Sequence, residues 1–185
     1  YCVRYCTHDH SDQERALVTK LYIDADACPV IREALAAARA QGVPCIIAGN
    51  STQNLERHLR ASDPHEPKDP AHPDRGFWAS TIQVGVGADS ADFAIVSAIT
   101  PADVVVTQDI GLADIVLGRG ARAIGVRGHV YNPLTIDSMM FIRHEEKKVR
   151  RAGGRTKGPA AFTDEDRERF SHNLARLLRE ARQAE

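Results

Sequence analysis

The sequence predicts an α/β fold, a three-layer sandwich in which helices flank a mainly parallel sheet. Apolar segments of strand length alternate along the chain with segments of helical periodicity. Val104-Val105-Val106 is the kind of β-branched run that lies in a strand covered on both faces. Strands alternating with helices are joined by right-handed crossovers, so the strands run parallel. The 185 residues suit one domain.

Proline and glycine residues mark the boundaries of the first elements. Pro29 suits the first turn of a helix, Gly42 suits its end, and Pro44 forbids its continuation. Strands are expected at 20–24, 43–48 and 82–86, with a short helix at 53–61. Residues 62–76 are rich in Pro, Asp and His, and they are expected to form an exposed inserted loop.

The second half of the chain continues the alternation. Helices are expected at 89–99, 110–117, 135–149 and from 163 onward, and strands at 103–107 and 123–126. Thr135 and Thr163 are the predicted N-caps of the last two helices. The terminal helix carries an apolar stripe of Phe170, Leu174, Leu177 and Leu178. The predicted domain is therefore 20–182, and the polar, aperiodic residues 1–19 are expected to form a flexible tail.

Charge and hydropathy limit the classes of function. The formal net charge is −1, but residues 85–118 hold five acids and no Lys or Arg. Residues 119–157 then hold ten Lys or Arg and three acids. This layout suits a metal site acting on an anionic polymer, and it also suits an ordinary solvated surface. No apolar run reaches membrane-spanning length and no signal-peptide pattern is present, so a cytoplasmic protein is expected.

The cysteines form no disulfide or zinc-ribbon framework. Cys28 and Cys45 fall in predicted helix-turn and strand positions, so reduced thiols are expected. Near the N-terminus, the side chains with ligand chemistry are Cys2, Cys6, His8 and His10. Their spacing matches no standard zinc module, and a zinc site there is not favoured.

Aspartates gather where the predicted strands end. Asp24, Asp26 and Asp109 follow strands, while Asp89 and Asp92 open a helix just after one. In a parallel sheet these positions share one edge, because all carboxyl ends of the strands lie there. Mg²⁺ and Mn²⁺ prefer oxygen ligands, and crowded carboxylates without a cation repel one another. These five acids are therefore the candidate metal ligands.

Each acid also has an ordinary structural interpretation. Asp26 and Asp89 suit helix N-caps, and Asp92 suits a solvent-exposed position. Asp103 starts a strand and is expected at the opposite edge of the sheet. Asp114 lies slightly more than one helical turn after Asp109 and suits a supporting or surface position. Asp24 and Asp109 are the strongest candidates, since each directly follows a buried strand.

Several motifs resemble those of the bacterial YaiI/YqxD family of uncharacterised proteins. They are LYIDADACPV at 21–30, GADSAD at 87–92, VTQDIGLA at 106–113, RG at 127–128 and the segment 151–162. The similarity covers about 20–178 in the same order. Residues 1–19 and the loop at 62–76 depart from the family pattern.

That family is grouped with the PIN-like nucleases, whose fold is a parallel sheet between helices. The resemblance implies a Mg²⁺- or Mn²⁺-dependent nuclease that hydrolyses phosphodiester bonds, with single-stranded RNA as the expected substrate. By position, Asp24, Asp109 and either Asp92 or Asp89 are similar to the family's catalytic acids. Thr107 is similar to a neighbouring hydrogen-bonding residue. PIN-like domains often pair, so a homodimer is an expectation, although no stretch marks an interface.

Basic residues after the fifth strand are candidates for binding phosphates. Arg127 is expected at the edge that carries the aspartates, with a positive rim beyond it. The rim residues are Arg143, Lys147, Lys148, Arg150, Arg151, Arg155 and Lys157. The predicted substrate-binding set is Thr107, Arg127, Lys147 and Arg151, although a solvated helix face accounts for about half of the basic charges. Tyr131 and Phe162 are the nearest aromatics, so contact with the backbone rather than the bases is expected. His129 and His144 are weaker general-base candidates.

Two other functions fit the same residues. Asp24 and Asp26 resemble the nucleophile and acid of a haloacid-dehalogenase-like phosphatase, but the lysine that such chemistry needs would have to be Lys68, in the Pro-rich loop. A non-catalytic RNA-binding or regulatory module would keep the same acids. Cleavage of small phosphoesters distinguishes the first, and RNA binding without turnover distinguishes the second.

Overall fold

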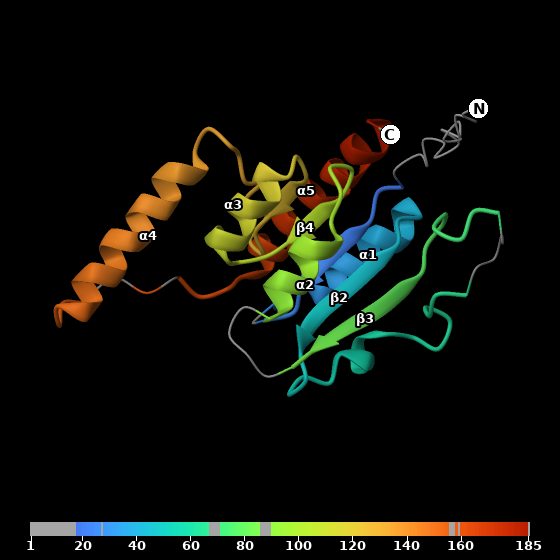
Figure 1. The fold of residues 1–185 in the computed structure, drawn as a ribbon, viewed down its shortest axis with the longest axis horizontal. Helices are drawn as coiled ribbons and strands as arrows, with labels where there is room; N and C mark the ends of the chain where they lie inside the picture. Colours follow the sequence, from blue (N-terminus) through green and yellow to red (C-terminus); the bar gives the residue numbers. More distant parts are fainter. Residues whose placement is uncertain are drawn as a thin grey trace, which may run out of the picture.

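Five parallel strands form one sheet in the computed structural model of the chain, in the order β3-β2-β1-β4-β5 (Figure 1). The structure describes residues 18–26, 28–66, 71–85, 90–155, 158 and 160–184. The strands are β1 (Leu21–Asp24), β2 (Cys45–Asn50), β3 (Ala79–Val84), β4 (Val104–Val106) and β5 (Arg122–Ile124). The helices are α1 (Ile31–Gln41), α2 (Ser90–Ala98), α3 (Ile110–Gly118), α4 (Ile136–Arg151) and α5 (Asp164–Gln183), with a 3-10 helix η1 (Leu55–His58). The predicted α/β sandwich is confirmed.

Helices cover both faces of the sheet, and the side chains of the strands alternate between them. Leu21 and Ile23 of β1 lie in the apolar cluster that includes α1 and α5. Tyr22 lies in the second cluster, with residues of α2 and α3. The three-residue run of β4 divides in the same way and is fully buried. This double burial explains why the central strands are apolar on both sides.

The helix after β1 begins later than the sequence predicts. Pro29 lies in a turn, and the first helical residue is Ile31. Val30 has φ −117° and ψ 21°, outside the helical region, while its carbonyl accepts a hydrogen bond from the Ala34 N–H at 2.9 Å. The predicted end at Gly42 is confirmed. Gly42 has φ 63°, in the left-handed region, and its N–H donates to the carbonyls of Ala38 and Arg39 in the last turn of the helix.

The segment between β2 and β3 differs most from the prediction. The expected helix at 53–61 is only η1, because Leu55 is its one buried residue and the chain is extended again at Leu59. The third strand runs from Ala79 to Val84, three residues earlier than expected, and pairs with β2 from Cys45 onward. This edge strand carries few apolar residues, so its start is weakly marked in the sequence. The described part of the predicted loop at 62–76 contains no helix or strand.

The two C-terminal helices differ in how they pack. In Figure 1, α4 extends away from the sheet, and Ile136 is its one buried residue. Thr135 precedes α4 but makes no side-chain cap, contrary to the prediction. Thr163 caps α5 as predicted and forms a reciprocal capping box with Asp166. The apolar stripe of α5 is buried against the sheet and α1, as expected.

Among the helices of the described residues, none has the length and apolar character needed to cross a membrane. Cys28 is half-buried and Cys45 is buried, and both thiols are free. The four side chains weighed above as zinc ligands lie outside the described residues, together with most of the predicted N-terminal tail.

Candidate functional site

Polar side chains meet at the carboxyl ends of the three central strands. Asp24 is the last residue of β1, Asn50 is the last residue of β2, and Thr107 directly follows β4. Because β1 lies between β2 and β4 and all three run parallel, their ends form one edge. Asp26 and Asp109 each lie two residues further along the chain, above the same edge.

Asp24 is a buried carboxylate held by neutral donors. It is 5% exposed; Oδ2 accepts a hydrogen bond from Thr107 Oγ1 at 2.8 Å, and Oδ1 accepts one from the Asp26 N–H at 3.1 Å. Burial raises the pKa of Asp24 above its ordinary value, and although these two hydrogen bonds lower it, the charges of Asp26 and Asp109 raise it further. Among the described residues, Asp24 therefore receives hydrogen bonds from neutral donors and has no cationic partner.

Asp26 is exposed and is oriented by two amides that the sequence did not single out. Its Oδ1 accepts hydrogen bonds from Gln53 Nε2 at 2.7 Å and from Asn50 Nδ2 at 3.4 Å. Gly49 makes room for this arrangement, because a Cβ there would lie 2.5 Å from Gln53 Oε1. The available signal for Asn50 was its position at the end of a predicted strand, on the edge that carries the aspartates. Gln53 had no such signal.

Asp109 has a cationic partner. Its Oδ1 caps α3 by accepting a hydrogen bond from the Gly111 N–H at 2.7 Å, and Arg143 of α4 donates to Oδ1 and Oδ2 at 2.8 and 3.3 Å. Burial raises the pKa of Asp109, but the hydrogen bonds from Arg143 and Gly111 outweigh it and hold the pKa below its ordinary value. Thr107 Oγ1 accepts from the Asp109 N–H at 3.0 Å, which links Asp109 to Asp24.

The other acids weighed from the sequence belong to other parts of the chain. Asp92 is half-buried in the first turn of α2, and Asp89 lies outside the described residues. Asp103 is at the opposite edge, as expected, where it accepts hydrogen bonds from the Lys20 and Thr100 N–H groups at 2.8 and 2.7 Å. Asp114 is half-buried on α3. The edge thus brings together three of the five predicted ligands.

Arg127, the predicted phosphate-binding arginine, is already engaged in contacts within the fold. Arg127 pairs with Asp166, donates to the carbonyls of Ala160 and Ala161, and lies over the ring of Phe162. It therefore anchors the segment before α5, and this arrangement does not favour phosphate binding by its guanidinium. Two other members of the predicted set, Lys147 and Arg151, are exposed on α4. Within the described residues, no acidic side chain forms an ion pair with either of them.

Aromatic side chains near the edge are already packed. Tyr131 is buried, and its hydroxyl donates to the Thr107 carbonyl at 3.4 Å. Phe162 is half-buried between the guanidinium groups of Arg127 and Arg167. His129 is exposed and packs edge-on against Tyr131 at 5.4 Å. These contacts support the expectation that bases are not stacked here.

The donor set suits a hard divalent cation such as Mg²⁺ or Mn²⁺, because its oxygens come from carboxylates and a hydroxyl. Asp24 is the best ligand, since its buried charge has only neutral donors. Within the described residues, no three acids, histidines or cysteines lie close enough to hold a metal by themselves. A cation held by Asp24 and Asp26 would therefore take further oxygens from water and a bound phosphate.

The fold and the edge define an α/β protein with a carboxylate site at the carboxyl end of a parallel sheet. The sequence pattern of the uncharacterised YaiI/YqxD family matches residues 68–180. A UPF0178 protein of Exiguobacterium sibiricum is 37% identical over 161 residues, which are 87% of this chain and 97% of that protein. UPF0178 proteins of Clostridium acetobutylicum and Vibrio parahaemolyticus are 35% and 36% identical, each over 86% of this chain and 96% and 97% of their own length. The chain belongs to the YaiI/YqxD family. No solved structure matches it.

Proposed function

We propose that the protein is a Mg²⁺- or Mn²⁺-dependent nuclease that hydrolyses phosphodiester bonds in single-stranded RNA in the cytoplasm. One observation carries the proposal: the buried carboxylate of Asp24 has only neutral hydrogen-bond donors and lies beside the charges of Asp26 and Asp109. Such an arrangement costs folding free energy unless a cation binds there. The free thiols of Cys28 and Cys45 support a reducing compartment.

The surrounding residues orient the carboxylates of this edge. Thr107 fixes the rotamer of Asp24 through its 2.8 Å hydrogen bond, and Gln53 and Asn50 hold Asp26 from the side of β2. A bound divalent cation would supply Lewis-acid polarisation of the phosphodiester and lower the pKa of an attacking water. Fixed ligands reduce the reorganisation that binding requires.

Asp109 and Arg143 form the exposed side of the edge. Their side chains are 38% and 48% exposed, so solvent weakens the ion pair and it can exchange partners. A phosphate that approaches the edge can accept hydrogen bonds from Arg143, which leaves Asp109 free to face the cation. This pair therefore gives the edge one cationic group for the substrate without neutralising Asp24.

The test is cleavage of end-labelled single-stranded RNA in Mn²⁺ by wild type, Asp24→Asn and Asp109→Asn. Asp103→Asn is the matched control, because Asp103 is a buried aspartate directly before β4, at the opposite edge. We expect loss of cleavage in the first two variants and retention in the control, with circular dichroism verifying that each is folded. Equal cleavage by Asp24→Asn and wild type would refute the proposed site.

Two outcomes would favour other functions. Release of phosphate from a small phosphoester, lost in Asp24→Asn, would indicate a phosphatase. RNA binding without cleavage in Mn²⁺ or Mg²⁺ would indicate a binding module. The homodimer expected from the family resemblance is a separate proposal, tested by the molar mass in solution.

A further inference from the structure

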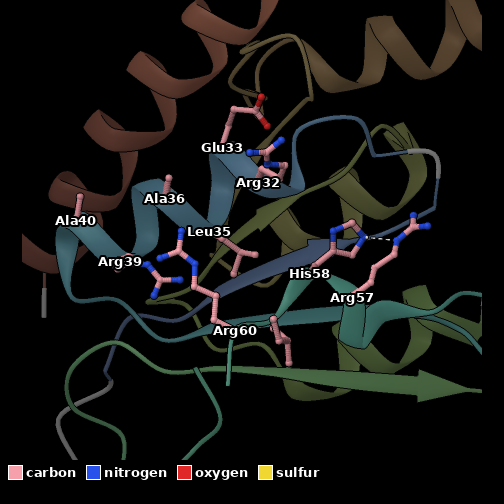
Figure 2. Close-up of a pocket in the computed structure, with 10 residues that line it drawn as sticks. Arg32, Glu33, Leu35, Ala36, Arg39, Ala40, Arg57, His58 and Arg60 are labelled. Carbon is pink, nitrogen blue, oxygen red and sulfur yellow. Dashed lines mark hydrogen bonds between the residues drawn. The ribbon is translucent and has the colours of Figure 1, made fainter. Parts of the chain in front are cut away.

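A groove lies between α1 and the η1 segment, on the β2 side of the molecule. Its volume is about 890 Å³. Figure 2 shows side chains from both elements gathered around it. The lining residues with charged or imidazole groups are Arg32, Glu33, Arg39, Arg57, His58 and Arg60. The groove belongs to neither the carboxylates of the edge nor the basic helix α4.

Three of the arginines in the groove are exposed and have no acidic partner. Arg32 comes from α1, Arg57 from η1, and Arg60 from the chain just after η1. In the part of the chain that the structure describes, no carboxylate forms an ion pair with any of the three. Three exposed arginines gathered along one groove raise its positive potential, which attracts an anionic ligand.

The acids near the groove are already paired. Glu33 accepts a hydrogen bond from Arg167 of α5 at 2.7 Å. The buried Asp63 accepts two hydrogen bonds from Arg39, at 2.9 and 3.2 Å. Arg39 also lies over the ring of Phe77 and is thus part of the fold. These pairs cancel one another's charge. Glu56 of η1 accepts a hydrogen bond from the Thr81 hydroxyl, so the three unpaired arginines still outnumber the acid of this segment.

His58 orients one of these arginines rather than adding charge. The Nε–H of Arg57 donates to His58 Nε2 at 3.1 Å. Burial and the charge of Arg57 lower the pKa of His58, which keeps its ring neutral and able to accept this hydrogen bond. The two remaining edges of the Arg57 guanidinium stay available to a ligand.

The groove continues to the carboxylate edge. A second cavity of about 340 Å³ shares Arg57 and His58 with the groove. Its other lining residues include Ala25, which lies between Asp24 and Asp26 in the chain, and Gln53, which donates to Asp26. A chain of phosphates in the groove would therefore extend to the acids through this second cavity.

We propose that this groove binds the sugar–phosphate backbone of a single-stranded nucleic acid and leads the strand to the carboxylate edge. A polymer fits better than a single phosphate, because the arginines come from separate segments and the groove continues beyond them. The lining consists of guanidinium groups and aliphatic side chains such as Leu35 and Leu59. Such groups can contact the sugar–phosphate backbone of a strand without distinguishing its bases. The direction toward the edge rests on the proposed nuclease function, whereas the binding itself does not.

The test measures the affinity of the full chain for a fluorescent oligouridine by anisotropy, in EDTA so that cleavage cannot interfere. The variant is Arg32→Gln/Arg60→Gln, and the matched control is Arg119→Gln/Arg122→Gln, which removes the same charge where α3 ends and β5 begins. Loss of two phosphate contacts lowers the slope of log K against log salt by about 1.4, which is about 25-fold in affinity at 0.1 M salt. We expect this loss in the groove variant alone.

The outcomes separate this proposal from the nuclease proposal. Asp24→Asn should bind oligouridine at least as well as wild type, so groove-dependent binding without any cleavage would uphold the groove and refute the nuclease. Equal affinity of the groove variant and wild type would overturn the groove, whatever the cleavage result. Competition by uridine monophosphate or inorganic phosphate at the concentration of the oligomer would overturn the polymer ligand. A larger loss in Lys147→Gln/Arg151→Gln than in the groove variant would assign the strand to α4 and overturn the proposal.

Discussion

Replacing Asp24 by Asn should stabilise the protein without metal and destabilise it, relative to wild type, with metal. The substitution preserves the shape of the side chain but removes a charge that burial disfavours. Thr107 can still donate to the remaining carbonyl oxygen, so one of the two hydrogen bonds at this side chain is kept whichever way the amide turns. The sign of the effect therefore follows from desolvation.

The magnitude comes from opposing contributions. Desolvation of a carboxylate costs several kcal/mol, and each hydrogen bond to a charged group returns about 1.5–3 kcal/mol, so the net gain for Asn is on the order of 1 kcal/mol. For a chain of this size, this raises Tm by about 2–4 °C. Mn²⁺ at a hundred times its dissociation constant would stabilise wild type by about 2.7 kcal/mol, or about 5–11 °C.

The assay is thermal unfolding by circular dichroism of wild type and Asp24→Asn, in EDTA and in Mn²⁺. The order of the two Tm values should reverse when the cation is added. Burial raises the pKa of Asp24, so the charge penalty of wild type is present above that raised pKa and disappears as pH falls toward the unfolded-state value. The difference in EDTA should accordingly close at acid pH. An Asn variant that is less stable in EDTA at neutral pH, or that responds to Mn²⁺ like wild type, would refute this reasoning.

Three further substitutions test other parts of the structure. Gly128→Ala should lower the free energy of unfolding, measured in urea, by about 2–4 kcal/mol, because φ is 81° and a Cβ would lie 2.8 Å from the backbone of α5. The control is Gly118→Ala, which has open space around it and should change the free energy of unfolding by less than about 1 kcal/mol. Arg143→Gln should lower the free energy of unfolding by less than about 1 kcal/mol, since the ion pair with Asp109 is exposed. It should also raise the pKa of Asp109 and tighten Mn²⁺ binding several-fold in calorimetry. Unchanged Mn²⁺ affinity would count against a metal beside Asp109. Arg127→Gln should lower Tm but leave oligouridine affinity unchanged, because its guanidinium holds the segment before α5; a loss of affinity with an unchanged Tm would restore it to the phosphate-binding set.

The sequence predicted the fold well because the signals for these elements are local. The end of α1 at Gly42 follows from a residue that tolerates positive φ, and the cap of α5 follows from the hydroxyl of Thr163. The run at Val104–Val106 identifies a doubly covered strand by itself. The helix predicted at 53–61 failed because single polar residues of helical propensity do not make a helix without an apolar face to bury.

The candidate site was predicted in part, through topology. Parallel strands place Asp24 and Asp109 at one edge whatever the details of packing, and the structure bears out that placement. The partners of these acids could not be predicted in the same way. Arg143 reaches Asp109 only because α4 contacts α3, and the two residues are 34 positions apart in the sequence. Gln53 reaches Asp26 through a short turn after β2, and its amide occupies space that a side chain at position 49 would fill.

The charges that the fold leaves unbalanced are the best guide to function in this chain. Two of the other buried acids, Asp63 and Asp166, pair with arginines, and the third, Asp103, is held by two backbone N–H groups and the Thr100 hydroxyl. Asp24 is equally buried but receives only a hydroxyl and a backbone N–H. The unpaired arginines of the α1–η1 groove are the complementary excess, and a cavity lined by Arg57 joins them to the turn that follows Asp24. The buried charge of Asp24 costs stability while it lacks a cation, whereas the exposed arginines are solvated and can exchange water for an anion; a cation together with a phosphodiester strand would engage both.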